Sequence, residues 1–279
     1  MSTSIDLSFV KQFEREVHEA YQRQGSLLRA TVRSKNNVKG ASTTFQKVGK
    51  GVASTKARHG KITPMNVDHT PIECTLQDFF AGDYIDKLDE AKVNHDERMV
   101  IANAGAWGLG RKTDELLITA ADASTTFVGD FTGAITRVLL VGAVEALDDN
   151  DVPDDGNRWG LLTPRQWSHA LTVSEFASAD FVGDDLPFMQ RNRTRSWLGV
   201  NWMRHTGLPG KSTTTGTCFA YHKNALGHAS GMDVTSDITW QGDRAAHFVN
   251  NMMSQGACLI DAEGVVEIRV NDTLAIPGS

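Results

Sequence analysis

The chain has 279 residues, a formal net charge of -6 and a pI near 5.8. Hydrophobic residues make up 40% of it and charged residues 22%, which is ordinary for a globular protein and excludes wholesale disorder or a fibrous repeat. The acidic balance excludes recruitment to nucleic acid by bulk positive charge. The three cysteines fit neither a disulfide framework nor a CxxC metal knuckle, and no apolar stretch of about 18 residues predicts secretion or a membrane span.

The N-terminal residues predict an amphipathic helix. Between Leu7 and Leu28 apolar residues, Phe9 and Phe13 among them, recur at steps of three to four residues with charged residues between them. Gly25 breaks or caps this helix. The pattern leaves one apolar face that must pack against another surface.

The charge is distributed unevenly along the chain. No Asp or Glu occurs between Arg29 and Val67, and nine cations fall there: Arg29, Arg33, Lys35, Lys39, Lys47, Lys50, Lys56, Arg58 and Lys61. An acidic cluster follows at Asp148, Asp149, Asp151, Asp154 and Asp155. Opposite charges on separate segments suit contacts between identical copies, although a solvated face is the commoner meaning of a charge run.

Residues 40–74 predict a long β-hairpin. Two extended runs, GASTTFQKVGKG and GKITPMNVDHTPIECT, flank a tip rich in Gly, Ser and Lys at Val52–Gly60. Each arm of about 15 residues would span roughly 50 Å. Its few apolar side chains could hardly offset about 1 to 2 kcal/mol of ordering entropy per residue, so we expect a surface outside its own domain to order it.

The remaining elements predict an α+β protein. A helix is expected at 94–121, where Gly105, Gly108 and Gly110 indicate a bend or a close contact. A second helix is expected at 131–147, and Thr163-Pro164 opens a short one through Leu171 after the buried strand RWGLLTP. Strands are expected at 197–205, at 215–223, and over most of the C-terminal part in the runs SDITWQG, AAHFVNNMMSQGACLI and GVVEIRV. Helices and strands alternate in no βαβ rhythm.

Five segments resemble one group of tailed-phage major capsid proteins, which have the Hong Kong ninety-seven type fold: FVKQFEREVHEAYQRQGSLLRATVR, FQKVGKG, GKITPMN, TLQDFFAGDYIDKLDEAKV and DERMVIANAGAWGLGRKTDELLITA. The specific match runs from Phe9 to Ala121. The second half is similar in layout and in its closing strand pair.

The resemblance implies a domain plan and a function. The plan is an N-terminal arm at 1–39, an extended loop at 40–75, a peripheral domain with a long spine helix at 76–130, an axial domain at 131–227, and peripheral return strands at 228–279. The implied function is self-assembly, as pentamers and hexamers, into the icosahedral head of a tailed phage enclosing double-stranded DNA. Implied partners are a separate scaffolding protein, because the arm helix begins within about ten residues, together with a portal and optionally a decoration protein. Assembly would take place in the bacterial host cytoplasm.

The arm and the loop supply the expected contacts between subunits. We expect these at Phe9, Phe13, Arg29, Arg33, Phe45, Lys47, Val48, Lys50, Lys56, Arg58 and Lys61. Some capsids of this fold cross-link a loop lysine to an asparagine on a neighbour. Here the spacing selects no pair among the loop lysines and Asn250, Asn251 or Asn271, and salt-bridging lysines are the better hypothesis.

No catalytic, cofactor or metal site is predicted. The segment Gly207–Thr213 superficially matches a phosphate-binding loop, but His205 stands where its first glycine is required and a strand follows. His222 and His228 are the closest pair of histidines in a strand-to-loop region, and their spacing is not that of metal ligands. The alternative function is a nucleic-acid-binding accessory protein that uses the basic segment 29–67. Single-strand binders place aromatic residues among their cations, whereas Phe45 is the one aromatic residue of this segment, which argues against the alternative.

Overall fold

A computed structural model describes residues 23, 25–90, 92, 96–173 and 194–276. The chain divides into two compact units, each of which draws on distant parts of the sequence. One unit contains Asp78–Lys112 and Met232–Ser254, and the other contains Ser26–Gln77, Thr113–Gly231 and the residues from Gln255 onward. The expected helix at residues 7–28, with Phe9 and Phe13, lies outside the described residues except for its last part.

The larger unit is built around a six-stranded mixed sheet. Its strand order is β5-β12-β9-β6-β8-β7, and the strands are β5 (Thr126–Val128), β6 (Arg158–Leu162), β7 (Thr194–Trp197), β8 (Val200–Arg204), β9 (Gly216–His222) and β12 (Val265–Val270). Every residue of β9 is buried, including the polar Thr217 and His222, as expected for a strand inside the sheet with both faces covered. The strands predicted within 197–205 and 215–223 are therefore confirmed.

Two helices pack on this sheet, and both begin at a threonine cap. Helix α3 (Arg137–Asp149) contacts β5, β9 and β12, whereas α4 (Pro164–Ala170) contacts β6 and β8. The Thr163 hydroxyl accepts a hydrogen bond from the Gln166 amide and Pro164 occupies the first turn, so the predicted short helix is confirmed. Helix α3 starts six residues later than the predicted Phe131, because Thr136 caps it and Phe131 lies in the left-handed region at φ 63°.

A long helix and four strands make up the second set of elements. Helix α2 (Glu97–Asp122) has 26 residues, which confirms the helix predicted at 94–121. A four-stranded sheet has the order β1-β10-β11-β4, from β1 (Arg33–Lys35), β4 (Gln77–Asp86), β10 (Leu226–Gln241) and β11 (Ala246–Leu259). The four-residue helix α1 (Lys87–Glu90) follows β4. Within the described ranges, 3-10 turns lie at η2 (Arg29–Thr31), η3 (Lys223–Ala225) and η4 (Ala262–Gly264).

Gly105 marks a close approach between α2 and two strands of the same unit. A Cβ atom at this position would lie 2.1 Å from the Asn251 side-chain nitrogen and 3.2 Å from the Ala81 carbonyl oxygen. Asn251 is buried and donates a hydrogen bond to that carbonyl at 3.2 Å. The close contact predicted from the helix glycines is therefore confirmed at Gly105, where it is made to a sheet.

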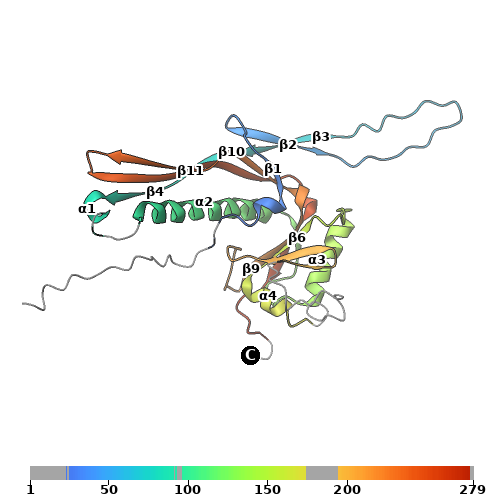
Figure 1. Cartoon of the computed structure of the whole chain (residues 1–279). Coiled ribbons are helices and arrows are strands. Elements are labelled where there is room, and N and C mark those ends of the chain that lie inside the picture. Colours follow the sequence, from blue (N-terminus) through green and yellow to red (C-terminus); the bar gives the residue numbers. More distant parts are fainter. Residues whose placement is uncertain (1–22, 24, 91, 93–95, 174–193, 277–279) are drawn as a thin grey trace, which may run out of the picture. The chain divides into compact units, whose positions relative to one another are not determined.

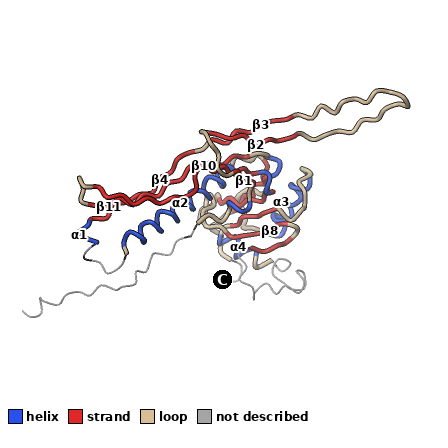
Figure 2. Tube along the Cα trace, turned by 45° about the horizontal axis from the view of Figure 1, so that its top comes forward, coloured by secondary structure: helices blue, strands red, loops and turns tan. Residues whose placement is uncertain are grey.

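The predicted hairpin is present, but its hydrogen-bonded part is shorter than expected. Strand β2 (Ser42–Val48) pairs antiparallel with β3 (His69–Thr75) from Ser42 opposite Thr75 to Val48 opposite His69. Residues 49–68, named the distal loop below, continue beyond the strands (Figures 1 and 2). One backbone hydrogen bond, from the Gly49 amide to the Asp68 carbonyl, joins the two ends of this loop. The expected arms of about 15 residues are thus wrong, because the ladder ends at the glycine-rich sequence after Val48.

The last strand, β12, belongs to the six-stranded sheet of the larger unit. It pairs antiparallel with β9 and parallel with β5. Its residues are almost all buried, and α3 packs against it. The domain limits expected from the sequence, including the return of residues 228–279 to a peripheral domain, stay predictions.

A buried carboxylate joins three segments of the larger unit. The Asp114 carboxylate on α2 accepts hydrogen bonds from the Ser26 hydroxyl at 2.5 Å, from the Leu27 and Leu28 amides at 3.1 to 3.2 Å, and from His205 Nε2 at 3.1 Å. His205 Nδ1 accepts from the Gly207 amide, so Nε2 carries the proton. Burial alone would raise the pKa of Asp114, but these hydrogen bonds outweigh burial and lower it.

Among the described residues, no helix combines the length and apolar character that crossing a bilayer requires. The finding agrees with the polar residues that recur along α2, the longest helix.

We predict that Asp114→Ala lowers the free energy of unfolding by about 3 to 5 kcal/mol at pH 7, because it leaves buried His205, the buried Leu28 amide and the half-buried Leu27 amide without their acceptor. The pKa of Asp114 is lower in the folded state than its unfolded value of about 4. The ionised carboxylate therefore stabilises the fold above about pH 4, and this stabilisation is lost as the pH falls through the folded-state pKa. The deficit of the variant should therefore shrink at pH 3. Denaturant unfolding of the subunit at both pH values measures it, with exposed Glu115→Ala as the control, and an equal deficit at both would contradict the assignment.

A matched pair of glycine substitutions tests the close contact in the smaller unit. Gly108→Ala should raise the melting temperature, because its Cβ meets only the Arg111 side chain at 3.7 Å and alanine favours helix by about 1 kcal/mol. Gly105→Ala should lower it despite the same gain, since Asn251 would have to move. Thermal unfolding followed by circular dichroism separates them, and two variants of equal stability would show that the contact is loose.

Candidate interaction surface

The hairpin is fixed to the larger unit by a small core beneath β2. Phe45 is 0% exposed and clusters with Cys74, Ala229 and Ile260. The cationic groups of Arg33 and Lys35 lie 5.7 and 4.8 Å from the centre of its ring, a range in which cations attract the ring face. The expectation that Phe45 contacts another subunit is wrong, because this side chain is fully buried within its own.

Two lysines of the predicted contact set are paired within the chain. Lys47 Nζ lies 2.7 Å from Asp261 Oδ1. Lys50 Nζ lies 3.0 Å from Asp151 Oδ2 and 3.8 Å from Glu263 Oε2, and it donates to the Asn150 carbonyl at 3.2 Å. The hydrogen bond to Asp151 and the surrounding carboxylates raise the pKa of Lys50, which disfavours the neutral amine that a cross-link would require.

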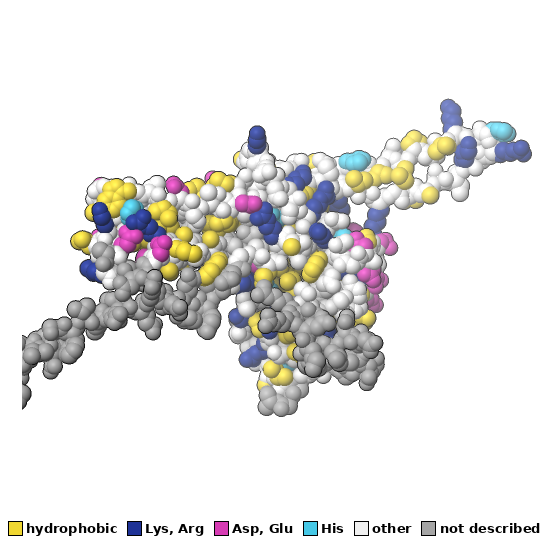
Figure 3. Space-filling model, in the orientation of Figure 1, with side chains coloured by type: hydrophobic (Ala, Val, Ile, Leu, Met, Phe, Trp, Pro, Cys, Tyr) yellow, Lys and Arg dark blue, Asp and Glu magenta, His cyan; other side chains and the backbone are white. Residues whose placement is uncertain are grey.

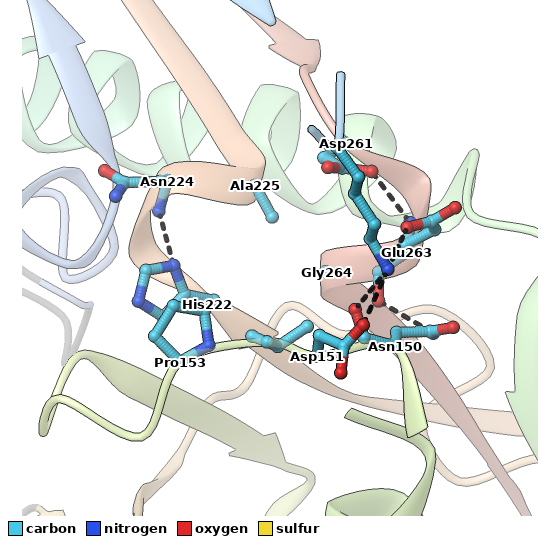
Figure 4. A pocket seen from close by; sticks show the side chains of 11 residues that line it. Asn150, Asp151, Pro153, His222, Asn224, Ala225, Asp261, Glu263 and Gly264 are labelled. Carbon is cyan, nitrogen blue, oxygen red and sulfur yellow. Dashed lines mark hydrogen bonds and ion pairs between the residues drawn. The ribbon is translucent and has the colours of Figure 1, made fainter. Parts of the chain in front are cut away.

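The carboxylates that receive these lysines come from two turns of the same unit. Asp151 follows α3, and Asp261 and Glu263 lie in the turn between β11 and β12 (Figure 4). The acidic cluster after α3 was noted from the sequence, but as a partner for another copy. The Asp261-Ala-Glu263 pair was missed, because a short acidic turn carries no signal of which cation it meets.

The remaining cations of the distal loop lie toward its tip. Lys56, Arg58 and Lys61 are exposed, and the Lys56 amine donates to the Gly60 carbonyl at 3.3 Å. In the space-filling view (Figure 3), basic side chains gather at the far end of this loop. Apolar groups accompany them, since Val52 is 78% and Ile62 76% exposed, and Met65 and Val48 are also exposed.

Arg29 and Arg33 lie near the hairpin rather than on the loop. Arg29 donates to the Asn36 side chain at 3.1 Å, and exposed Arg33 stands over the Phe45 ring. Of the eleven predicted contact residues, Val48, Lys50, Lys56, Arg58 and Lys61 are exposed on the hairpin and its loop, and Phe9 and Phe13 lie outside the described residues.

The smaller unit presents a second apolar surface along β10. Met232, Val234, Ile238 and Trp240 are all exposed and, at even spacing in an extended strand, share one face. The neighbour on the far side of β10 is β1, whose register covers only Gly227–Ala229. In the part of the chain that the structure describes, the edge from Val234 to Trp240 thus has no strand beside it, an arrangement that proteins normally protect.

The phosphate-loop-like segment and His222 make local structural contacts within the larger unit. The segment Gly207–Thr213 is a turn in which Gly210 lies at φ 62°, and β9 follows it. His222 Nε2 pairs with Asp155 at 3.1 Å, and hydrogen bonds from Asn157 and His222 lower the pKa of Asp155 to about 2. Throughout the described ranges, no group of three His, Cys, Asp or Glu side chains could hold a metal ion.

The imidazole ring of His228 also has a hydrogen-bond partner within the larger unit. Its Nε2 lies 3.1 Å from the Gln255 side-chain oxygen, which also accepts a hydrogen bond from Thr113 at 2.7 Å. His222 and His228 therefore have separate structural partners and do not converge on a common site.

Comparison with known proteins assigns the fold and the family. The phage capsid protein family matches residues 5–272, and no curated protein matches the chain. Solved structures with the same fold include the capsid of the cyanophage P-SCSP1u, at 17% identity and TM-score 0.75, covering 98% of this chain and 96% of that one. A chain of Mycobacterium phage Che8 is 18% identical with TM-score 0.73, covering 94% and 97%, and the capsid of Ralstonia phage GP4 is 13% identical with TM-score 0.73, covering 100% of both.

These neighbours are tailed-phage capsids of the Hong Kong ninety-seven type, so the predicted α+β fold is confirmed. The alternative function, nucleic-acid binding by segment 29–67, finds no support, and Lys35, Lys47 and Lys50 in that segment have partners within the chain. The match extends over nearly the whole sequence. The chain belongs to the phage capsid protein family and is a major capsid subunit that assembles with copies of itself into the shell of the virion.

Proposed function

We propose that the distal loop of each subunit docks on a neighbouring copy and that this contact holds pentamers and hexamers together in an icosahedral head enclosing double-stranded DNA. The observation that carries the proposal is the composition of the loop surface. Val52 and Ile62 are more than three quarters exposed, and cations stand beside them without an acidic residue before Asp68. An apolar and basic segment of this kind is poorly stabilised by its own contacts and gains from a neighbour that covers it.

We propose the β10 edge of the neighbouring subunit as the acceptor. It offers exposed apolar side chains at Val234, Ile238 and Trp240 on one face, and exposed Asp237 lies in the same stretch of the strand on the opposite face. A strand added to this edge would satisfy its backbone groups, while the loop cations would meet an acidic side chain. Pairing of two β10 edges about Asp237 would instead place like charges opposite each other, which is unfavourable.

The role is proposed to be structural, without a catalytic step. Head-to-tail contacts of this kind close into rings when the rotation between copies allows it. A scaffolding protein, a portal and a decoration protein are proposed as further partners, and the host cytoplasm as the place of assembly, on the strength of the fold resemblance alone.

Replacing Val52–Gly60 by a short Gly-Ser turn should abolish shell formation and leave the subunit folded, because the removed residues are exposed and make no core contact. Negative-stain microscopy of the protein expressed with its neighbouring genes measures particles, and thermal unfolding measures folding. The control is Ser54→Ala with Thr55→Ala, which retains every charged and apolar side chain of the loop. Normal shells from the replacement would refute loop docking.

Charge reversal at the acceptor edge provides a separate test. Asp237→Lys should raise the subunit concentration required for assembly several-fold, since it places a cation where the loop cations dock. Static light scattering against subunit concentration at two salt concentrations measures the threshold. Glu145→Lys reverses an exposed acid on α3 of the larger unit and is the control. Equal thresholds for both variants would exclude β10 as the acceptor.

A further inference from the structure

The backbone by itself leaves the exit direction of the distal loop weakly determined. The β2–β3 ladder ends where Val48 pairs with His69, and a single hydrogen bond from Gly49 to Asp68 follows. Glycines stand on both sides of Lys50, at 49 and 51. Because glycine restricts the backbone least, the chain can turn at this root unless side chains hold it.

Two lysine side chains near the loop root form ion pairs with other parts of the larger unit. Lys47, on the last part of β2, pairs with Asp261 at 2.7 Å, and Lys50, the second residue of the loop, pairs with Asp151 at 3.0 Å. The two lysines are three residues apart: Lys47 meets the turn before β12, and Lys50 lies between that turn and the turn after α3. A pair of attachments at separate points restricts rotation about the root, which one attachment would leave free.

The acceptor side is arranged independently of the loop. The Asp261 carboxylate accepts a hydrogen bond from the Glu263 amide at 3.1 Å, which holds it at the start of η4. The Asn150 side chain donates to the Glu263 carbonyl at 3.0 Å and so connects the turn after α3 with the turn before β12. Figure 4 shows Asn150, Asp151, Asp261 and Glu263 around one hollow. The Lys50 amine lies 3.0 Å from Asp151 and 3.8 Å from Glu263.

The exposure of these pairs indicates what they can do. The side chains of Lys50 and Asp151 are 65% and 80% exposed, and exposed ion pairs add little to stability and weaken in salt. The Lys50–Asp151 pair therefore contributes little to the stability of the fold, and the Lys47–Asp261 pair, with side chains 36% and 33% exposed, is also open to solvent. Because these pairs add little stability, their main consequence is to limit the directions that the distal loop can take.

We infer that Lys47 and Lys50 are positioning residues, which set the direction in which the distal loop leaves its own subunit and so preselect the neighbour that it reaches. This inference rests on the proposed docking of the loop, and it assigns these lysines to the subunit that carries them and not to the contact between subunits. A tether of exposed ion pairs can also be released and remade, so the loop direction responds to ionic strength.

The tether is tested first on the unassembled subunit. Spin labels at Val52→Cys and Glu145→Cys, in a Cys258→Ser background, report the distance from the loop root to α3. Lys47→Ala with Lys50→Ala should broaden the distance distribution, as should 0.5 M salt, and Lys47→Arg with Lys50→Arg should keep it narrow. The control Lys56→Ala with Lys61→Ala should leave it unchanged. A distribution that the Lys47 and Lys50 substitutions do not alter would overturn the inference.

Assembly then separates this inference from loop docking. Lys50→Glu should give particles of mixed size or shape, and combining it with Asp151→Lys should restore uniform shells. Cryo-electron microscopy of particles counts the size classes. Uniform shells from Lys50→Glu alone would overturn positioning even where the Val52–Gly60 replacement abolishes assembly. Normal assembly by that replacement would instead overturn docking, whatever the spin-label distances show.

Discussion

The buried carboxylate of Asp114 is the interaction on which the larger unit depends. Its oxygens accept hydrogen bonds from the chain at Ser26–Leu28 and from His205 at the end of β8, so one side chain of α2 determines where two other segments lie. Next to it, Thr113 donates to Gln255 on β11. Burying a carboxylate is costly unless hydrogen bonds satisfy it, and here the satisfied group fixes a single arrangement.

The hairpin combines a rigid base with an exposed end. At the base, Phe45 is enclosed by Cys74, Ala229 and Ile260, so β2 cannot leave the body without exposing a large aromatic side chain. Beyond Val48 the ladder stops and apolar groups such as Val52 and Ile62 face solvent. Packing within the subunit therefore stabilises the base of the hairpin, whereas the distal loop exposes apolar side chains that a surface outside the subunit can cover.

A shell built from such segments can combine reversibility with persistence. A single contact of modest strength dissociates readily, but roughly 1.4 kcal/mol is tenfold in an equilibrium constant, so several contacts per subunit multiply. Weak positioning pairs at the loop root fit this scheme. A loop that is already directed loses less conformational freedom when it docks, although the pairs themselves contribute little stability.

The sequence by itself determined the elements whose signal is local. The apolar periodicity of α2, the Thr163-Pro164 start of α4 and the strands of the C-terminal part could all be predicted, because spacing and caps act over a few residues. It also indicated a loop that needs an external surface. The tertiary structure alone decided that Phe45 is core, that Lys47 and Lys50 meet Asp261 and Asp151, and that β12 pairs with β9. These facts depend on residues about 50 to 215 positions apart, which no local pattern brings together.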